Sequence, residues 1–204
     1  MNLPADIEKL IETLTLMKSN FMNDSIVCVR SQSFIRMLQD YCIEELYSLG
    51  FEREKLYTEK VILGSHKPKN VDVSYIDPYN GPLIIIGVRS QMSSVHKNLL
   101  TYYEEIIGDS ISLHDRFPMA VINYMYLLPL QSIKRGKEHE MTDLPRAEKL
   151  FKLITDRGDW RNTKDKYEHF AFLKVDFTQD PPLLLDTIPE LSVFNFFDKI
   201  KETY

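Results

Sequence analysis

A continuous apolar run near the middle of the chain ends abruptly in small and polar residues. Residues 83–86 (LIII) have no polar position on either face; the turn sequence DPYNG precedes them at 77–81, and GVRSQ follows at 87–91. A strand that is apolar on both faces is typical of the centre of a sheet covered by helices on both sides. The run therefore predicts a mixed α/β fold, in which 87–91 lie where the strand leaves the core.

Helical and strand periods alternate around this run. Apolar residues recur at helical spacing over 4–20 and 31–49, whereas 55–64 and 70–77 are short, alternating and rich in β-branched and aromatic residues. Beyond the run, the pattern predicts a helix at 94–113, a strand within 116–129, a helix at 144–156, a strand at 168–177 and a helix at 188–202. This order predicts an α/β three-layer sandwich, with a mixed central β-sheet flanked by helices.

Composition limits the class of protein. The 204 residues are 44% hydrophobic, which suits one core, so a single domain over 1–204 is expected. No stretch approaches the roughly 18 apolar residues of a membrane-spanning helix, and the acidic N-terminal segment is unlike a secretion signal, so a cytoplasmic protein without a membrane partner is expected. The sequence has no glycine-rich phosphate loop, no GxSxG and no Cys/His metal spacing.

One aspartate stands at a spacing from the run that suggests chemistry. Asp72 lies early in the predicted hairpin, and Gly87, Arg89 and Gln91 share one face of the next strand, so Asp72 and Arg89 are expected to meet across adjacent strands. Metal-dependent cleavage of a phosphodiester uses hard oxygen ligands for a divalent ion and a cation that stabilises the charge on phosphorus. An aspartate and an arginine on one face supply part of that set.

The element order, with KNVD at 69–72 and GVR at 87–89, resembles the PD-(D/E)xK restriction endonuclease-like superfamily, and in particular a type II restriction endonuclease. The resemblance covers about residues 31–177. It implies a Mg²⁺-dependent DNA endonuclease, with Mn²⁺ as a possible substitute, that cuts double-stranded DNA as a homodimer or with a partner subunit. By this resemblance Asp72 matches the motif aspartate, Gly87 stands at the second carboxylate, and Arg89 replaces the lysine.

A subset of that superfamily carries the second carboxylate on the helix after the strand. Glu104 falls in a predicted apolar stripe with positions 100, 107 and 111, whereas Glu105 is expected at the surface. A buried carboxylate is costly unless a cation compensates it. Glu104 is therefore the candidate second metal ligand beside Asp72, and an ordinary boundary glutamate is the alternative.

Further polar residues near the strand end are candidates for contacts with DNA. Arg89 would stabilise the phosphate. Gln91 would either orient water or touch the scissile phosphate, or else hydrogen-bond a loop. The start of the following helix offers backbone N–H groups and a lysine for a phosphate. The predicted DNA-binding residues are Lys67, Lys69, Ser94, Lys97 and Asn98.

Two other classes of function stay open on the sequence. A module that keeps the nuclease fold and has lost the chemistry would bind DNA or a partner without metal, because the second acidic position and the lysine position are both replaced. An interaction domain with no nucleic-acid role is the third option. Net charge is −5, which argues against indiscriminate binding to polyanions, and the basic residues fit a cleft and a scattered surface equally well.

Overall fold

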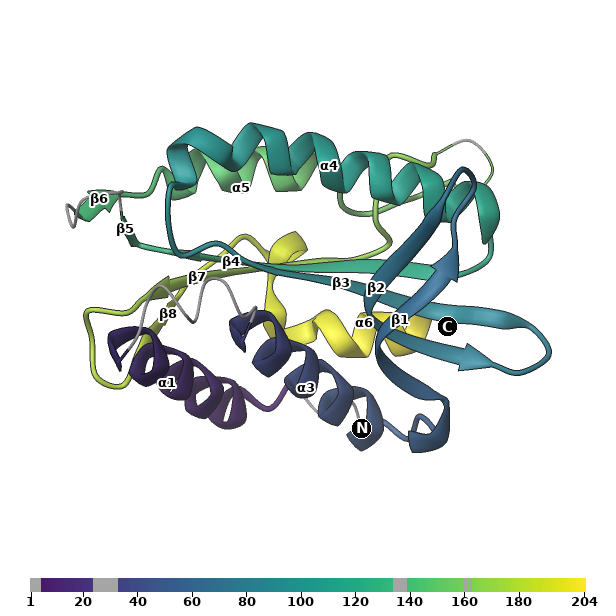
Figure 1. Cartoon of the computed structure of the whole chain (residues 1–204), viewed down its shortest axis with the longest axis horizontal. Helices are drawn as coiled ribbons and strands as arrows, with labels where there is room; N and C mark the ends of the chain where they lie inside the picture. The colour runs from purple at the N-terminus through teal and green to yellow at the C-terminus, as the bar shows by residue number, and fades with distance from the viewer. Residues whose placement is uncertain (1–4, 24–32, 134–138, 160, 162) are drawn as a thin grey trace.

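A computed structural model of the chain describes residues 5–23, 33–133, 139–159, 161 and 163–204. Figure 1 shows three layers, with the sheet in the middle. One face is covered by α1 (Ile7–Asn23), α3 (Ser33–Ser48) and α6 (Phe196–Thr203), and the other by α4 (Val95–Arg116) and α5 (Leu144–Leu153). The predicted three-layer α/β sandwich is confirmed.

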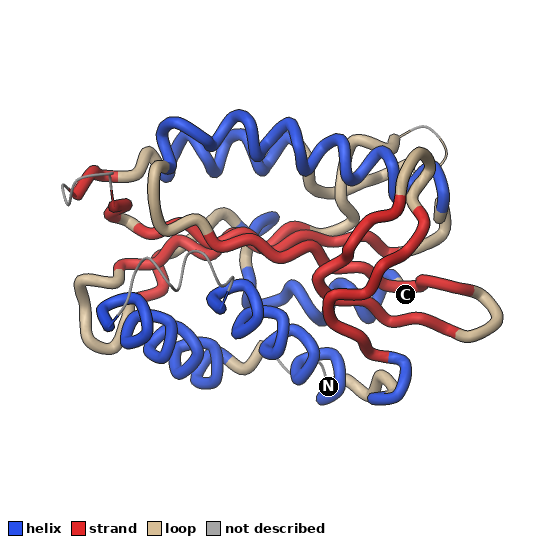
Figure 2. The backbone as a smooth tube through the Cα atoms, in the orientation of Figure 1, coloured by secondary structure: helices blue, strands red, loops and turns tan. Residues whose placement is uncertain are grey.

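The central sheet is mixed, as predicted. Its strands are ordered β1-β2-β3-β4-β7-β8. The first three pair antiparallel, β3 with β4 and β4 with β7 pair parallel, and β8 closes the edge antiparallel. The strand bounds are β1 Leu56–Leu63, β2 Pro68–Asp77, β3 Gly81–Ser90, β4 Val121–Pro129, β7 Phe170–Asp176 and β8 Leu183–Leu185. Figure 2 shows the β1–β2 hairpin twisting across the rest of the sheet.

The predicted hairpin turn between β2 and β3 is confirmed, and its chemistry explains it. The side-chain oxygen Oδ1 of Asp77 accepts hydrogen bonds from the backbone N–H groups of Tyr79 and Asn80, both at 3.0 Å. Gly81 has φ 81°, a left-handed value that glycine adopts without strain. The turn thereby delivers β3 into the centre of the sheet.

β3 is a central strand because both of its faces are apolar. Ile84, Ile86 and Val88 belong to the core beneath α1 and α3, and Ile85 belongs to the core beneath α4 and α5. Every residue of β4, its parallel neighbour, is buried. The polar residues that follow in β3 consequently lie where the strand reaches the border of this core.

Short elements depart from the predicted pattern. The segment predicted as a helix at 188–202 begins with two 3₁₀ turns, η2 (Pro189–Leu191) and η3 (Val193–Asn195), before α6. Another 3₁₀ turn, η1 (Arg53–Lys55), precedes β1, and a separate hairpin joins β5 (Gln131–Ile133) to β6 (His139–Met141). Among the described helices, none is long and apolar enough to cross a membrane.

Candidate functional site

Asp72 on β2 is held from two sides. Its Oδ2 accepts a hydrogen bond from the backbone N–H of Val88 in β3 at 2.7 Å, and its Oδ1 accepts one from Nε2 of Gln39 in α3 at 3.0 Å. Burial raises the pKa of Asp72 to about 6, although both donors favour the charged form and lower the pKa. The carboxylate is thus fixed at the junction of α3, β2 and β3.

The raised pKa of Asp72 predicts a pH-dependent stability. A carboxyl whose pKa rises from 3.8 to about 6 on folding binds its proton more tightly in the folded protein. Its contribution is therefore fully present below about pH 4 and is lost as pH rises through about 6. Relative to Asp72→Asn, the wild type is expected to gain about 2 to 3 kcal/mol of unfolding free energy between pH 7 and pH 4. Urea unfolding of both proteins across that range measures the gain, and a difference independent of pH would rule it out.

A second carboxylate, which was not predicted from the sequence, faces Asp72. Glu59 on β1 stands opposite Asp72, because its two neighbours in the strand pair with the two neighbours of Asp72. Its φ of 51° lies in the left-handed region, which is uncommon for a residue other than glycine. Its Oε1 accepts a hydrogen bond from Nε2 of Gln39 at 2.5 Å, and its Oε2 accepts one from Nδ2 of Asn70. One amide nitrogen therefore bridges both carboxylates.

These two carboxylates fit part of the ligand set of a hard divalent ion. Each carboxylate oxygen that accepts one hydrogen bond keeps a further lone pair, and Glu59 is exposed to solvent. Mg²⁺ is commonly held by one or two carboxylates and keeps several waters or phosphate oxygens. Within the described residues, no three His, Cys, Asp or Glu side chains gather into one group. Asp72 and Glu59 would accordingly share an ion with water and substrate.

An aromatic ring fills the place beside Gly87. Gly87 pairs with Tyr124 of the parallel strand β4, and a Cβ atom added at Gly87 would lie 2.4 Å from Cε2 of that ring. Tyr124 is buried and stacks on Phe170, with ring centroids 5.5 Å apart. The Tyr124 ring therefore occupies the space that a side chain at position 87 would need. Packing favours glycine there and leaves no room for a carboxylate.

Gly87→Ala is expected to lower the unfolding free energy by about 2 kcal/mol, because the added methyl group overpacks a filled core. Urea denaturation measures the loss. Gly108→Ala is the matched control, because nothing lies within 4 Å of a Cβ there and the residue is in helix α4. The control should be neutral or up to about 1 kcal/mol more stable. Equal effects at both positions would show that the Tyr124 ring moves aside freely.

The sequence led us to expect that Arg89 meets Asp72 across adjacent strands. In the structure, the Arg89 side chain instead turns toward α4. Its Nη2 lies 3.4 Å from Oε2 of Glu105, and its guanidinium carbon lies 4.1 Å from the ring centroid of Tyr102. In the described part of the chain, no ion pair joins Arg89 to Asp72. The charge of Arg89 still lowers the pKa of Asp72. Arg89 therefore influences Asp72 through its charge, and its ion pair is with Glu105.

The apolar stripe predicted on α4 is wrong. Leu100 and Ile111, which were expected to be buried with Glu104, are 46% and 38% exposed, and Glu104 is exposed too. The stripe that packs against the sheet includes Val95, Leu99, Ile106, Ser110 and Leu113. Both stripes carry apolar residues, so periodicity could not choose between them. Glu104 as a metal ligand stays a prediction, and the strand register sets Glu59 opposite Asp72.

The side-chain amide of Gln91 forms hydrogen bonds within the protein. Its Oε1 accepts a hydrogen bond from the Tyr126 hydroxyl at 2.8 Å, and its Nε2 donates to the backbone oxygen of Ser94 at 3.4 Å. The side chain is buried. Of the roles considered for Gln91, the structure shows the loop hydrogen bond, and a role in orienting water or touching the scissile phosphate stays a prediction.

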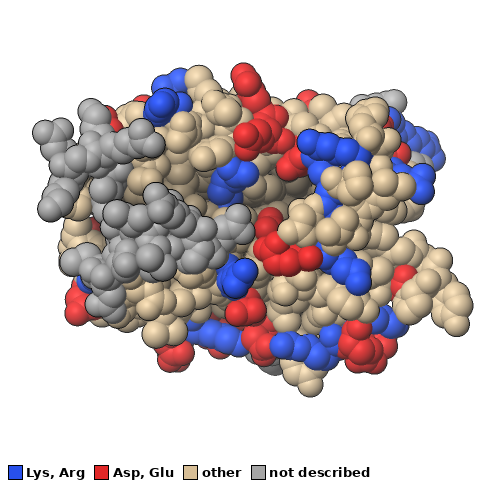
Figure 3. All heavy atoms as spheres, viewed as in Figure 1, with Lys and Arg blue, Asp and Glu red and all other residues tan. Residues whose placement is uncertain are grey.

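The predicted DNA-binding residues fall in two places, the β1–β2 hairpin and the start of α4. Lys67 and Lys97 are exposed, whereas Lys69 forms an ion pair with Asp109 of α4. Ser94 precedes α4 with φ 54° and makes no capping bond through its side chain, and Asn98 is half-buried in the first turns. Figure 3 shows basic and acidic side chains interspersed on the face it draws. The distribution alone does not favour a basic cleft.

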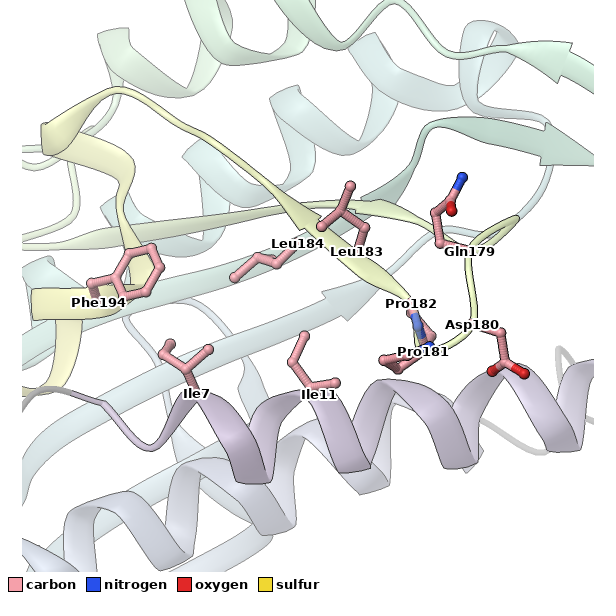
Figure 4. A pocket seen from close by; sticks show the side chains of 9 residues that line it. All are labelled: Ile7, Ile11, Gln179, Asp180, Pro181, Pro182, Leu183, Leu184 and Phe194. Atoms are coloured by element: carbon pink, nitrogen blue, oxygen red, sulfur yellow. The ribbon is translucent and has the colours of Figure 1, made fainter.

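An apolar groove lies at the other edge of the sheet. Ile7 and Ile11 of α1 face Leu184 of β8 and Phe194 across it (Figure 4). β8 is the last strand in the sheet order and β1 and β2 are the first two, so the groove is not part of the Asp72 site.

Comparison with known proteins gives no match: no protein-family model, no curated protein and no solved structure matches this chain. The geometry of the site itself therefore carries the functional argument.

Proposed function

We propose that this protein is a divalent-metal-dependent DNA endonuclease, a type II restriction enzyme or the cleavage subunit of one. The observation that supports this most is the pair of facing carboxylates, Asp72 and Glu59, bridged by the amide of Gln39. The pair lies at the β2 aspartate that the sequence resemblance singled out, with Arg89 on the neighbouring strand. A strained backbone at Glu59 is consistent with a functional role, because such strain is often kept at functional sites.

The chain's own residues would divide the work as follows. Asp72 and Glu59 would hold Mg²⁺ or Mn²⁺, and Gln39 would keep their spacing by donating to both. The ion would stabilise negative charge on the phosphate and lower the pKa of water. Arg89 stays charged at every relevant pH, so it would stabilise the phosphate electrostatically and would not act as a base.

The proposed function also implies an assembly. One such site cuts one strand of DNA, so cleavage of both strands requires a homodimer or a partner subunit. A restriction role would place the protein in the cytoplasm, with double-stranded DNA as its substrate.

Supercoiled plasmid incubated with the protein in Mg²⁺ or Mn²⁺ tests the proposal. Nicked and linear forms are expected with either ion and should disappear with EDTA. A pool of genomic DNA beside the plasmid lets the assay sample many candidate recognition sequences. Intact DNA in both ions, with a protein that circular dichroism shows to be folded, would overturn the proposed cleavage.

The second candidate is a nuclease-fold module that binds DNA or a partner without cutting. The Tyr124 ring beside Gly87 favours it, because that packing leaves no room for a carboxylate in β3. This candidate predicts salt-dependent DNA binding that EDTA does not weaken, with no nicking in Mg²⁺ or Mn²⁺. Metal-dependent nicking would exclude it.

A further inference from the structure

Arg89 contacts two residues of α4 and also interacts with the side chain of Tyr124 in β4. The Tyr102 ring lies under the guanidinium at 4.1 Å, and the Glu105 carboxylate lies 3.4 Å from Nη2. Tyr102 and Glu105 are three residues apart in the helix, so they project from the same side of it. The ring supports one face of the guanidinium, and the carboxylate occupies one edge.

The contact between Arg89 and Glu105 is one that an anion from solution can replace. The side chains are 27% and 51% exposed, and 3.4 Å is longer than the about 2.7–2.9 Å of a charge-assisted hydrogen bond. Because Glu105 is exposed and loosely held, its pairing with the partly buried Arg89 contributes little to stability. A phosphate offers a guanidinium two parallel hydrogen bonds, which makes it a stronger partner than a distant carboxylate.

We propose that Glu105 is an exchangeable counter-ion of Arg89 that competes with DNA for the guanidinium. Glu105 occupies Arg89 in the free protein, and a DNA phosphate displaces it. Tyr102 keeps the guanidinium in place during the exchange. The role rests on the proposed function only in that DNA is the ligand, and it holds for the cutting and the non-cutting candidate alike.

The adjacent carboxylate provides a matched control. Glu104 and Glu105 are both exposed, and Glu104→Gln removes the same charge one residue along the same helix. Within the described chain, an ion pair is formed by Glu105 and none by Glu104. Any general effect of net charge on DNA binding is therefore common to the two variants, and the difference between them reports on Arg89.

Fluorescence anisotropy of labelled duplex DNA in EDTA tests the exchange without requiring cleavage. Glu105→Gln is expected to tighten DNA binding about three- to fivefold more than Glu104→Gln does, which corresponds to the upper range for an exposed ion pair. The difference should disappear when both changes are repeated in an Arg89→Gln background.

Three outcomes would overturn the counter-ion role of Glu105: equal effects of the two variants, weaker binding by Glu105→Gln, or a difference that survives without Arg89. If the wild type binds DNA and the two variants behave alike, the counter-ion role is rejected, but the proposed function is not. Absence of DNA binding by all the proteins in EDTA would reject the exchange, and plasmid cleavage in Mg²⁺ or Mn²⁺ would then decide the proposed function separately.

Discussion

Asp72→Asn and Glu59→Gln are each expected to lower DNA cleavage in Mg²⁺ by about a thousandfold. Each change removes one carboxylate charge and nearly keeps the size of the side chain. A bound ion contributes several kcal/mol to the stabilisation of charge in the transition state, and each 1.4 kcal/mol corresponds to about a factor of ten in rate. Initial rates of plasmid nicking at saturating Mg²⁺ measure the loss.

Two control variants show whether the loss of cleavage is specific to Asp72 and Glu59. Glu104→Gln should cleave within about twofold of wild type, because Glu104 lies on α4 whereas the strand register sets Glu59 opposite Asp72. Glu54→Gln, in the exposed turn η1 before β1, gives the effect of losing a surface charge near the hairpin. Loss of cleavage in Glu104→Gln together with normal cleavage in Glu59→Gln would return the second ligand to α4.

Glu168→Ala is expected to lower the unfolding free energy by about 3 to 5 kcal/mol, the largest stability effect predicted for the chain. Glu168 Oε1 accepts a hydrogen bond from Arg157 Nη1 at 2.6 Å, and Oε2 accepts one from the Ile122 backbone N–H at 2.8 Å and lies 3.2 Å from His114 Nε2. Burial alone would raise the pKa of Glu168, but His114 and Arg157 outweigh it and lower the pKa. Removing this carboxylate takes from the buried Arg157 a charged partner that lies at 2.6 Å.

An exposed pair gives the comparison for Glu168. Lys152 and Glu190 lie 3.0 Å apart with both side chains more than a third exposed, so Glu190→Ala should cost much less unfolding free energy than Glu168→Ala. Urea unfolding at pH 7 measures both losses. Losses of similar size would mean that the buried carboxylate is no more important than a surface one. Retained cleavage by folded Glu168→Ala is also expected, because the residue does not contact Asp72.

The fold could be predicted because its main signals are local. The run at 83–86 identified a central strand, the turn at 77–81 identified a hairpin, and the long helical and strand periods gave the layers. The three-residue strands β5, β6 and β8 were missed, because an element of that length carries too little periodicity to be recognised. The late start of α6 was missed because 3₁₀ turns continue a helical pattern of apolar residues.

The site was predicted only in part, because it depends on register and helix rotation. Asp72 and Arg89 were chosen from spacing along the chain, which placed them on adjacent strands but did not reveal that Arg89 turns to α4. Glu59 was missed, although a turn placed near Gly64 would have fixed the β1–β2 register and set Glu59 opposite Asp72. Glu104 was chosen over Glu105 because α4 has apolar residues on more than one side. The hydrogen bonds from Gln39 of α3 to Glu59 and Asp72 join a helix to two strands, and no sequence pattern predicts such contacts.

A crystal structure with Mn²⁺ and DNA tests the central claim most directly, because it reports the ligands themselves. One ion is expected with carboxylate oxygens of both Asp72 and Glu59 at about 2.0–2.6 Å. Arg89 should then contact a phosphate, with Glu105 displaced. An ion held by a carboxylate of α4 without Glu59, or DNA bound over Asp72 with both carboxylates still joined only through Gln39, would contradict the proposed site.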